Sequence, residues 1–463
     1  MKAVFVLKNY KENLTEGPIL KKMIFFVLPL IATSILQQLF HTADMSVVGR
    51  FAGDDAYAAV GSTGTVVGLF IEFFMGFSVG VNVVVGHAIG RKDEGEVSKG
   101  VHTAILFSVI CGLIIAIIGI PFTRKLLELT SVPCEIIDMA TLYLGIYFCG
   151  MPFYMLYNFA SAIFRAKGES RIPLYCLIAG GVINVILNLV FVLVFGMGVE
   201  GVAIATVISN IVSSFLAVTA LIKQNDSIKL HLSKLKLHKT VLVRFIKLGL
   251  PSGFLYSVFS ISNLIVQSSI NSLGVNVISA SSAAAGIEIY VQYFGNAFAQ
   301  CATTFISQNY GAAKHERCRK AARLALIMSV LITTALSLAV YSLGTPLIKI
   351  FTVNKTIIAI ALLRMRYTLL FKPLQSVMDI MVGCLQGYGK TLPTSLISIF
   401  VVCGVRIIWI YTFFAKVGTL PALMVIYPIT WGLAALSHSA CYFWVLKRNT
   451  QKIKGEKELK YEK

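Results

Sequence analysis

Charged residues are scarce in this 463-residue chain, and acidic residues are especially few. Asp and Glu together number 21 against 41 Lys and Arg, and the four charged types make up only 13% of the sequence. Hydrophobic residues make up 57%, and the mean hydropathy is +0.79. Soluble domains average about 25% charged residues, so the composition predicts a polytopic membrane protein.

Several catalytic and energy-coupling motifs are missing as well. The sequence contains no GxxxxGK[ST], HExxH or GxSxG, so we predict neither ATP-driven work nor an enzyme, and no catalytic residues. The nine Cys residues form no CxxC pair, and His41, His87 and His102 lie in separate elements, so we expect no disulfide framework, metal site or cofactor. The first 20 residues lack a long apolar core with a cleavage site, and we expect no cleaved signal peptide.

Hydropathy predicts an all-α integral membrane protein of about twelve transmembrane helices. The predicted spans are 23–45, 56–86, 101–121, 138–160, 173–195, 200–222, 245–271, 278–306, 322–342, 357–384, 393–414 and 420–446.

The basic residues gather in alternate connections. Roughly three quarters of all Lys and Arg fall in one of the two sets of connections, which by the positive-inside rule is cytoplasmic. This set holds the N-terminal tail, Arg91, Lys92, Lys99, Arg165, Lys167, Arg171, Lys223–Lys247, Lys314–Arg323, Lys390 and the tail from Lys447. We therefore expect a multi-pass protein of the cell membrane with both termini in the cytoplasm. The charge indicates contact with membrane lipid, not with nucleic acid.

The chain repeats itself at an offset of about 221 residues. GDDAYAAV, from Gly53, aligns with GVNVISAS, from Gly274, and GHAIGRKDEGEVSKG, from Gly86, aligns with SQNYGAAKHERCRKA, from Ser307. An even number of spans in each copy predicts two co-oriented six-helix lobes related by a pseudo-twofold axis along the membrane normal. The predicted domains are an N-terminal lobe (1–222), a cytoplasmic linker loop acting as a tether (223–244), a C-terminal lobe (245–446) and a basic tail (447–463). We expect a monomer.

The first span carries polar residues that hydrocarbon disfavours. A carboxylate such as Asp44 costs about 2.5–3.5 kcal/mol at the centre of a membrane helix on insertion scales. Gln37 lies two turns before Asp44, so both share one helix face. Pro29 lacks a backbone N–H and allows this helix to kink. We interpret this face as a working polar surface; the alternative is a carboxylate placed by chance near a helix end.

Other polar residues lie within the apolar spans of both halves. Carboxylate, amide and hydroxyl oxygens suit Na⁺ or a transferable proton, and Asn184 and Asn188 share a face because they are four residues apart. The alternative interpretation is hydrogen bonding between helices, which is worth only about 0.6 kcal/mol on average. The candidate coupling residues are Asp44, Asn158, Asn184, Asn188, Thr206, Glu288 and Asp379.

The second half adds charged residues of both signs. Asp379 and Arg406 form a natural ion pair, whereas Glu288 has no obvious cationic partner in its span. Burial without a partner disfavours a charged carboxyl, which suits Glu288 to proton exchange; the alternative is an interfacial carboxylate. Tyr290 and Tyr293 could hold a flat cation by cation–π contact or belong to an aromatic belt.

The sequence resembles the multidrug and toxic compound extrusion (MATE) family across about residues 14–446. The stretches that carry the resemblance are LTEGPILKK, LPLIATSILQQLFHTADMSVVGRFAG, YNFASAIFRAKGESRIP, FGMGVEGVAIATVISN and MDIMVGCLQGYGKT. The resemblance implies two six-helix lobes forming a V, and export of organic cations driven by entry of H⁺ or Na⁺.

The resemblance also assigns roles to individual positions. Asp44 matches the acid of the family's first span, and Pro29 matches its bending proline. Asn158, Asn184 and Thr206 match polar members of the first-lobe cation site, and Asp379 matches an acid of the second-lobe site described for some members. Two departures occur: Asn188 stands where many relatives have a second acid, and SGFLYSVFSISN in the seventh span contains no acid.

The predicted function is secondary antiport: export of amphipathic organic cations or drugs in exchange for H⁺ or Na⁺. The predicted substrate cavity contains Gln37, Tyr290, Tyr293 and Arg406, and Pro29 is the predicted gating kink. The alternative is a flippase for lipid-linked oligosaccharides, which shares the helical plan. It needs several cations for a pyrophosphate, and only Arg406, Arg364 and Arg366 are available.

Overall fold

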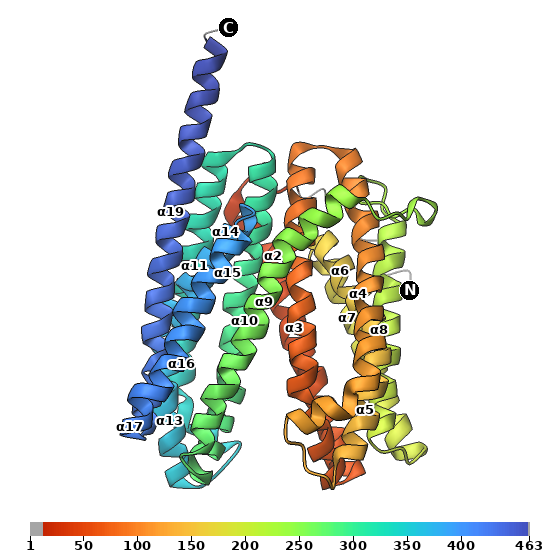
Figure 1. Cartoon of the computed structure of the whole chain (residues 1–463), viewed down its shortest axis with the longest axis vertical. Coiled ribbons are helices and arrows are strands. Elements are labelled where there is room, and N and C mark those ends of the chain that lie inside the picture. Colours follow the sequence, from red (N-terminus) through yellow and green to blue (C-terminus); the bar gives the residue numbers. More distant parts are fainter. Residues whose placement is uncertain (1–12, 462–463) are drawn as a thin grey trace. The chain divides into compact units, whose positions relative to one another are not determined.

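The computed structural model describes residues 13–461, with side chains to residue 451, and all regular structure in that range is helical. Lys2, Lys8 and Lys11 of the predicted N-terminal basic tail lie outside the described residues. The α-helices (Figure 1) are α2 (Ile19–Val47), α3 (Asp54–Arg91), α4 (Glu94–Leu129), α5 (Ile137–Cys149), α6 (Met151–Lys167), α7 (Arg171–Leu189), α8 (Val199–Ile222), α9 (Lys239–Asn271), α10 (Val275–Gly311), α11 (His315–Ser342), α12 (Gly344–Lys349), α13 (Lys355–Leu369), α14 (Lys372–Gly387), α15 (Thr391–Ile397), α16 (Val405–Trp409), α17 (Ala415–Val417), α18 (Leu420–Met424) and α19 (Ile426–Tyr461).

The predicted all-α membrane fold is confirmed. Among the described residues, nine helices are long and apolar enough to cross a membrane, and α5 with α6, bent by 47°, forms a tenth candidate. The two remaining predicted spans, 278–306 and 357–384, coincide with α10 and with α13 plus α14. With 15 and 16 residues, α13 and α14 are each too short to cross alone. Together they cover the predicted span 357–384, with a break at Leu370 and Phe371.

Large apolar side chains remain exposed on the outer faces of the helices. Ile117 on α4 is 70% exposed, and Leu331 on α11 is 64% exposed. These are two of many exposed large hydrophobic residues, and soluble proteins rarely expose extensive apolar surface. Their exposure is what a hydrocarbon environment requires.

The helices pack into two compact units. Unit 1 comprises Met1–Ser257 with Ser307–Cys318, and unit 2 comprises Val258–Ile306 with Arg319–Lys463. The division therefore passes through α9, α10 and α11, not through the linker between the halves. The sequence-based domain boundaries remain a prediction about chain duplication. In the packing, two segments of the second half, 245–257 and 307–318, belong to unit 1.

Glycines explain why the first half of α9 belongs to unit 1. Gly76 and Gly80 on α3 face Gly249 and Gly253 on α9. A Cβ on Gly76 would lie 2.1 Å from the backbone N of Gly253, and one on Gly249 would lie 2.6 Å from the Cα of Phe77. Pairs of small residues four apart let membrane helices approach closely. Two such pairs, one on each helix, build this crossing.

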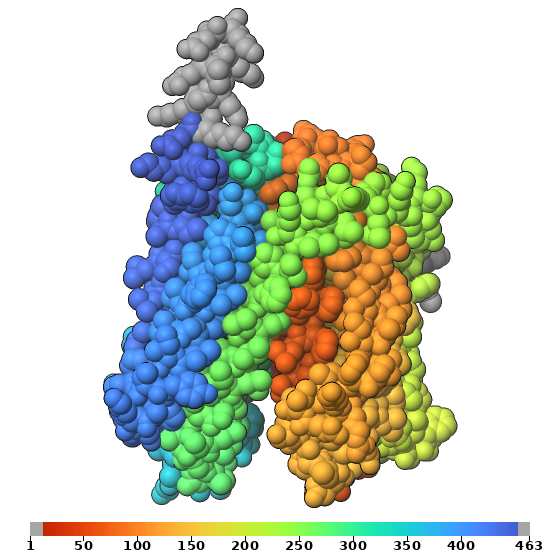
Figure 2. Space-filling view, viewed as in Figure 1, coloured from red at the N-terminus to blue at the C-terminus, as the bar shows by residue number. Residues whose placement is uncertain are grey.

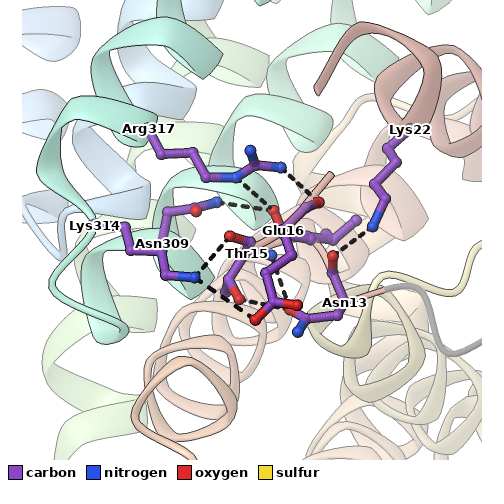
Figure 3. Close-up of polar contacts among 8 residues, drawn as sticks. Asn13, Thr15, Glu16, Lys22, Asn309, Lys314 and Arg317 are labelled. Atoms are coloured by element: carbon purple, nitrogen blue, oxygen red, sulfur yellow. Dashed lines mark hydrogen bonds and ion pairs between the residues drawn. The ribbon is translucent and has the colours of Figure 1, made fainter. Parts of the chain in front are cut away.

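The segment before α2 is held by side chains from the α10–α11 connection (Figure 3). Arg317 donates from Nε to the carbonyl oxygen of Leu14 at 3.2 Å and from Nη2 to that of Glu16 at 2.8 Å. Asn309 donates to the same Leu14 oxygen at 3.3 Å, and Lys314 Nζ lies 3.8 Å from the Glu16 carboxylate. Non-helical backbone needs such partners. The contacts tie residues 307–318 to unit 1.

The linker between the halves is folded against unit 1. Ile228 and Leu230 are buried in the hydrophobic core of that unit. The backbone N–H of His231 donates to Nε2 of His102 on α4 at 3.1 Å, and Figure 2 shows the green linker beside the orange end of α4. Alternate apolar residues of the linker therefore supply core contacts in addition to the predicted role of joining the two halves.

Candidate functional site

Asp44 lies near the end of α2, where it meets two amides from α7. Asn188 Nδ2 donates to Asp44 Oδ1 at 2.5 Å and to Asn184 Oδ1 at 3.4 Å. Asn184 and Asn188 share one buried face of α7, as their spacing predicts. A hydrogen bond from a neutral amide to a carboxylate is charge-assisted and therefore stronger than an ordinary amide contact.

A hydroxyl from α8 completes this cluster. Asn184 Nδ2 donates to Thr206 Oγ1 at 3.4 Å, and Thr206 donates to the carbonyl of Val202 at 3.0 Å. Asn184 and Thr206 both lie close enough to interact with the Asp44 carboxyl. We call Asp44, Asn184, Asn188 and Thr206 the Asp44 cluster. It brings three helices of unit 1 to one point.

The Asp44 cluster contains one acid and only neutral partners. Within the described residues, no Lys, Arg or His forms an ion pair with Asp44. Asn188 is 0% exposed, and its Oδ1 has no hydrogen-bond partner among the described atoms. A buried carbonyl oxygen without a donor costs stability. The cluster therefore offers both a negative charge and a spare oxygen to a cation or an acidic proton.

The other predicted residues of the first half lie apart from this cluster. Asn158 is buried on α6, and its Nδ2 donates to the carbonyl of Tyr154 in the same helix at 2.8 Å. Gln37 is exposed on α2. Pro29 lies inside α2, where it removes a helical hydrogen bond, while Thr33 Oγ1 donates to the Pro29 carbonyl at 2.8 Å. The helix continues through this weak point.

Glu288 does have a cationic partner, contrary to the expectation from its own span. Arg364 Nη2, from α13, donates to Glu288 Oε2 at 3.4 Å, and Thr368 Oγ1 donates to Oε1 at 2.5 Å. Glu288 is 8% exposed and Arg364 9%. Arg364 could not be predicted as the partner because it lies on another helix. Sequence periodicity shows which residues share a face of one helix, but not which helices are in contact.

The predicted ion pair between Asp379 and Arg406 is wrong. Arg406 Nη1 donates to Asn263 Oδ1 at 3.3 Å, and its guanidinium lies 4.7 Å from the ring centroid of Tyr427. Asp379 instead accepts from Gln292 Nε2 at 3.4 Å. A carbonyl and an aromatic face are enough to hold a guanidinium, which is weakly hydrated and planar.

One further charged residue of unit 2 is buried but was not among the predicted site residues. Lys372 begins α14, is 8% exposed, and has Nζ 5.6 Å from the ring centroid of Trp431. Its ammonium also interacts electrostatically with Glu288 and Asp379. The sequence does mark this residue, because a lysine in the interior of the predicted span 357–384 is costly and therefore indicates a specific role.

The two predicted tyrosines of the substrate cavity contact each other. Tyr290 and Tyr293 pack edge to face at 6.2 Å between ring centroids.

Comparison with known proteins agrees with this architecture. The MatE family model matches residues 29–190 and again residues 251–412, as a duplicated chain should. The chain is 29% identical to the probable multidrug resistance protein YoeA of Bacillus subtilis (strain 168), over 94% of this chain and 96% of that protein. It is 22% identical to the multidrug export protein MepA of Staphylococcus aureus (strain N315), over 81% of this chain and 83% of that protein.

A solved structure gives the same result for the fold. An outward-facing multidrug resistance MATE family transporter of the MOP superfamily superimposes with a TM-score of 0.88, at 21% identity, over 96% of this chain and 99% of that one. The matched family model covers most of the chain. The chain is a multi-pass membrane protein and belongs to the MatE family of multidrug efflux transporters.

Proposed function

We propose that this transporter is an antiporter that exports amphipathic organic cations or drugs across the cell membrane in exchange for H⁺ or Na⁺. The observation that carries the proposal is the Asp44 cluster, in which a half-buried carboxylate has only neutral hydrogen-bond partners among the described residues. Both termini are cytoplasmic in this proposal, as the distribution of basic residues predicts.

The chemistry of the Asp44 cluster suits either ion. Carboxylate, amide and hydroxyl oxygens are the ligands that hard cations prefer. A proton can also be accommodated, because an Asn amide donates to a carboxylate through Nδ2 and, once turned, accepts from a carboxylic acid through Oδ1. Asn188 has both groups beside Asp44, and its Oδ1 has no described partner. The ion neutralises Asp44 in either case.

Coupling requires that the ion and the drug prefer different states of the protein. Neutralising Asp44 removes the charge that strengthens its bond to Asn188, so α2 is held less firmly against α7. Pro29 gives α2 a position at which it can bend without breaking a hydrogen bond, because that bond is already missing. Bending of α2 then changes the drug site.

On the substrate side, the proposal relies on Tyr290 and Tyr293 of unit 2, while Gln37 on α2 and Arg406 remain candidates from the sequence. Tyr faces can hold a flat organic cation. The flippase alternative is disfavoured, because Arg406 is already engaged by Tyr427 and Asn263, as Arg364 is by Glu288. A pyrophosphate would have to displace these partners.

The test is export of ethidium from proteoliposomes under separately imposed pH and Na⁺ gradients. Asp44→Asn should abolish gradient-driven export, since a neutral amide cannot be charged or discharged. Asp44→Glu should retain part of it. Full export by Asp44→Asn under either gradient would exclude Asp44 as the coupling residue.

A further inference from the structure

Unit 2 contains a charged cluster that differs in kind from the Asp44 cluster; three of its four members are buried and Asp379 is half-buried. Its acids are Glu288 on α10 and Asp379 on α14, and its bases are Arg364 on α13 and Lys372 on α14. The formal charges sum to zero. The Asp44 cluster of unit 1, by contrast, contains one acid and no described base.

Helix geometry relates the lysine to Asp379, and hydrogen bonds fix the surroundings of the two acids. Lys372 and Asp379 are seven residues apart on α14, two turns, and so lie on one face. On α10, Glu288 and Gln292 are four residues apart; Glu288 is bound by Arg364 and Thr368, and Gln292 donates to Asp379. Among the described residues no ion pair within 4 Å joins Lys372 to either acid, so its ammonium acts on them by its charge at longer range, whereas Arg364 lies 3.4 Å from the Glu288 carboxylate. Lys372 is thus the group left to balance Asp379.

The interruption between α13 and α14 places Lys372 within the span. Only Leu370 and Phe371 separate the two helices, and Pro373 follows Lys372 at the start of α14. By the repeat offset, Lys372 aligns with Met151, an apolar residue at the start of α6. The lysine is therefore specific to the second copy. Burying an ammonium is costly unless nearby acids compensate it.

We propose that Lys372 is a tethered counter-cation: it supplies to Asp379 the positive charge that a mobile H⁺ or Na⁺ supplies to Asp44. Unit 2 then takes up no coupling ion, and exchange is confined to the Asp44 cluster. The statement that exchange is confined to unit 1 rests on the function proposed for Asp44. The role of Lys372 as the counter-cation of Asp379 does not depend on that proposal.

The test is Na⁺ binding in an Asp44→Asn background, which removes the unit 1 site. Radioactive ²²Na⁺ binding and Na⁺-dependent Tm are measured on purified protein at alkaline pH, where few protons compete. Asp44→Asn alone should bind no Na⁺. Adding Lys372→Gln should create saturable Na⁺ binding and a Tm that rises with Na⁺ but not with choline. Adding Lys372→Arg instead should create neither, because the charge is kept.

A further variant guards against simple misfolding. Asp379→Asn combined with Lys372→Gln restores charge balance, so this protein should be stable without Na⁺ and bind none. The proposal is overturned if Lys372→Gln binds no Na⁺, or if the charge-balanced variant is no more stable in choline than Lys372→Gln alone. Na⁺ binding by Asp44→Asn alone, with Lys372 intact, would also overturn it. Failure of Asp44 as the coupling residue would show in transport and leave these binding results unchanged.

Discussion

Replacing Gly76 by Ala tests the close crossing of α3 and α9 on which unit 1 depends. The new Cβ would lie 2.1 Å from the backbone N of Gly253 and 2.4 Å from its Cα. Non-bonded heavy atoms rest about 3.5–4.0 Å apart, so α9 would have to retreat by about 1.5 Å. Both contacted atoms belong to the backbone, and no rotamer change can relieve the clash.

The expected loss follows from two opposing terms. Overpacking costs about 1–3 kcal/mol, and we place this variant at the upper end because the contacts are with backbone. Exchanging Gly for Ala inside a helix returns about 1 kcal/mol. We therefore expect a net loss of about 2 kcal/mol in the free energy of unfolding.

The assay is thermal unfolding of the detergent-solubilised protein, followed by tryptophan fluorescence. The matched control is Gly68→Ala on the same helix, where the new Cβ meets no atom within 4 Å. Gly68→Ala should leave Tm unchanged or slightly raised, and Gly76→Ala should lower it. Equal Tm values for the two variants would refute the close-crossing argument.

Three further substitutions test individual contacts. Thr368→Val removes the 2.5 Å bond to Glu288 and should destabilise the protein by about 1.5–3 kcal/mol, whereas Thr368→Ser should restore most of the Tm; a Val variant as stable as wild type would contradict the contact. Arg317→Gln weakens the bonds to the N-terminal backbone and should speed proteolysis at residues 13–17, while unchanged cleavage would mean that the segment is held by other groups. Asn188→Asp places a second carboxylate beside Asp44, where two charges cannot coexist without a cation; ethidium export should become more dependent on external H⁺ or Na⁺, and an unaltered ion dependence would speak against contact between the two side chains.

Periodicity within a helix made the first-half site predictable. Asn184 and Asn188 share a face because they are four apart, and Asp44 stood out as a charge in an apolar span. The structure brings these residues together, with Thr206, from three helices. The contacts of Asn158 within its own helix could not be foreseen, because an amide in a span can bond to its own helix or to a neighbour.

Pairing between helices explains the errors in the second half. Arg406 was assigned to Asp379, and Glu288 was left without a partner, because the sequence does not specify which helices are adjacent. The contacts of Arg364 and Lys372 come from the interrupted span of α13 and α14, whose break is invisible to a hydropathy window. The number of spans and the duplication were accessible, because both are properties of the chain order alone.

The measurement that tests the central claim most directly is ion movement driven by the drug. Proteoliposomes loaded with ethidium are diluted into dye-free buffer without any ion gradient, and H⁺ and Na⁺ fluxes are recorded as the dye leaves. We predict that one of these ions moves inward with the wild-type protein, and that Asp44→Asn eliminates the flux. Efflux of ethidium with no opposing H⁺ or Na⁺ flux, or a flux that persists in Asp44→Asn, would contradict exchange at Asp44.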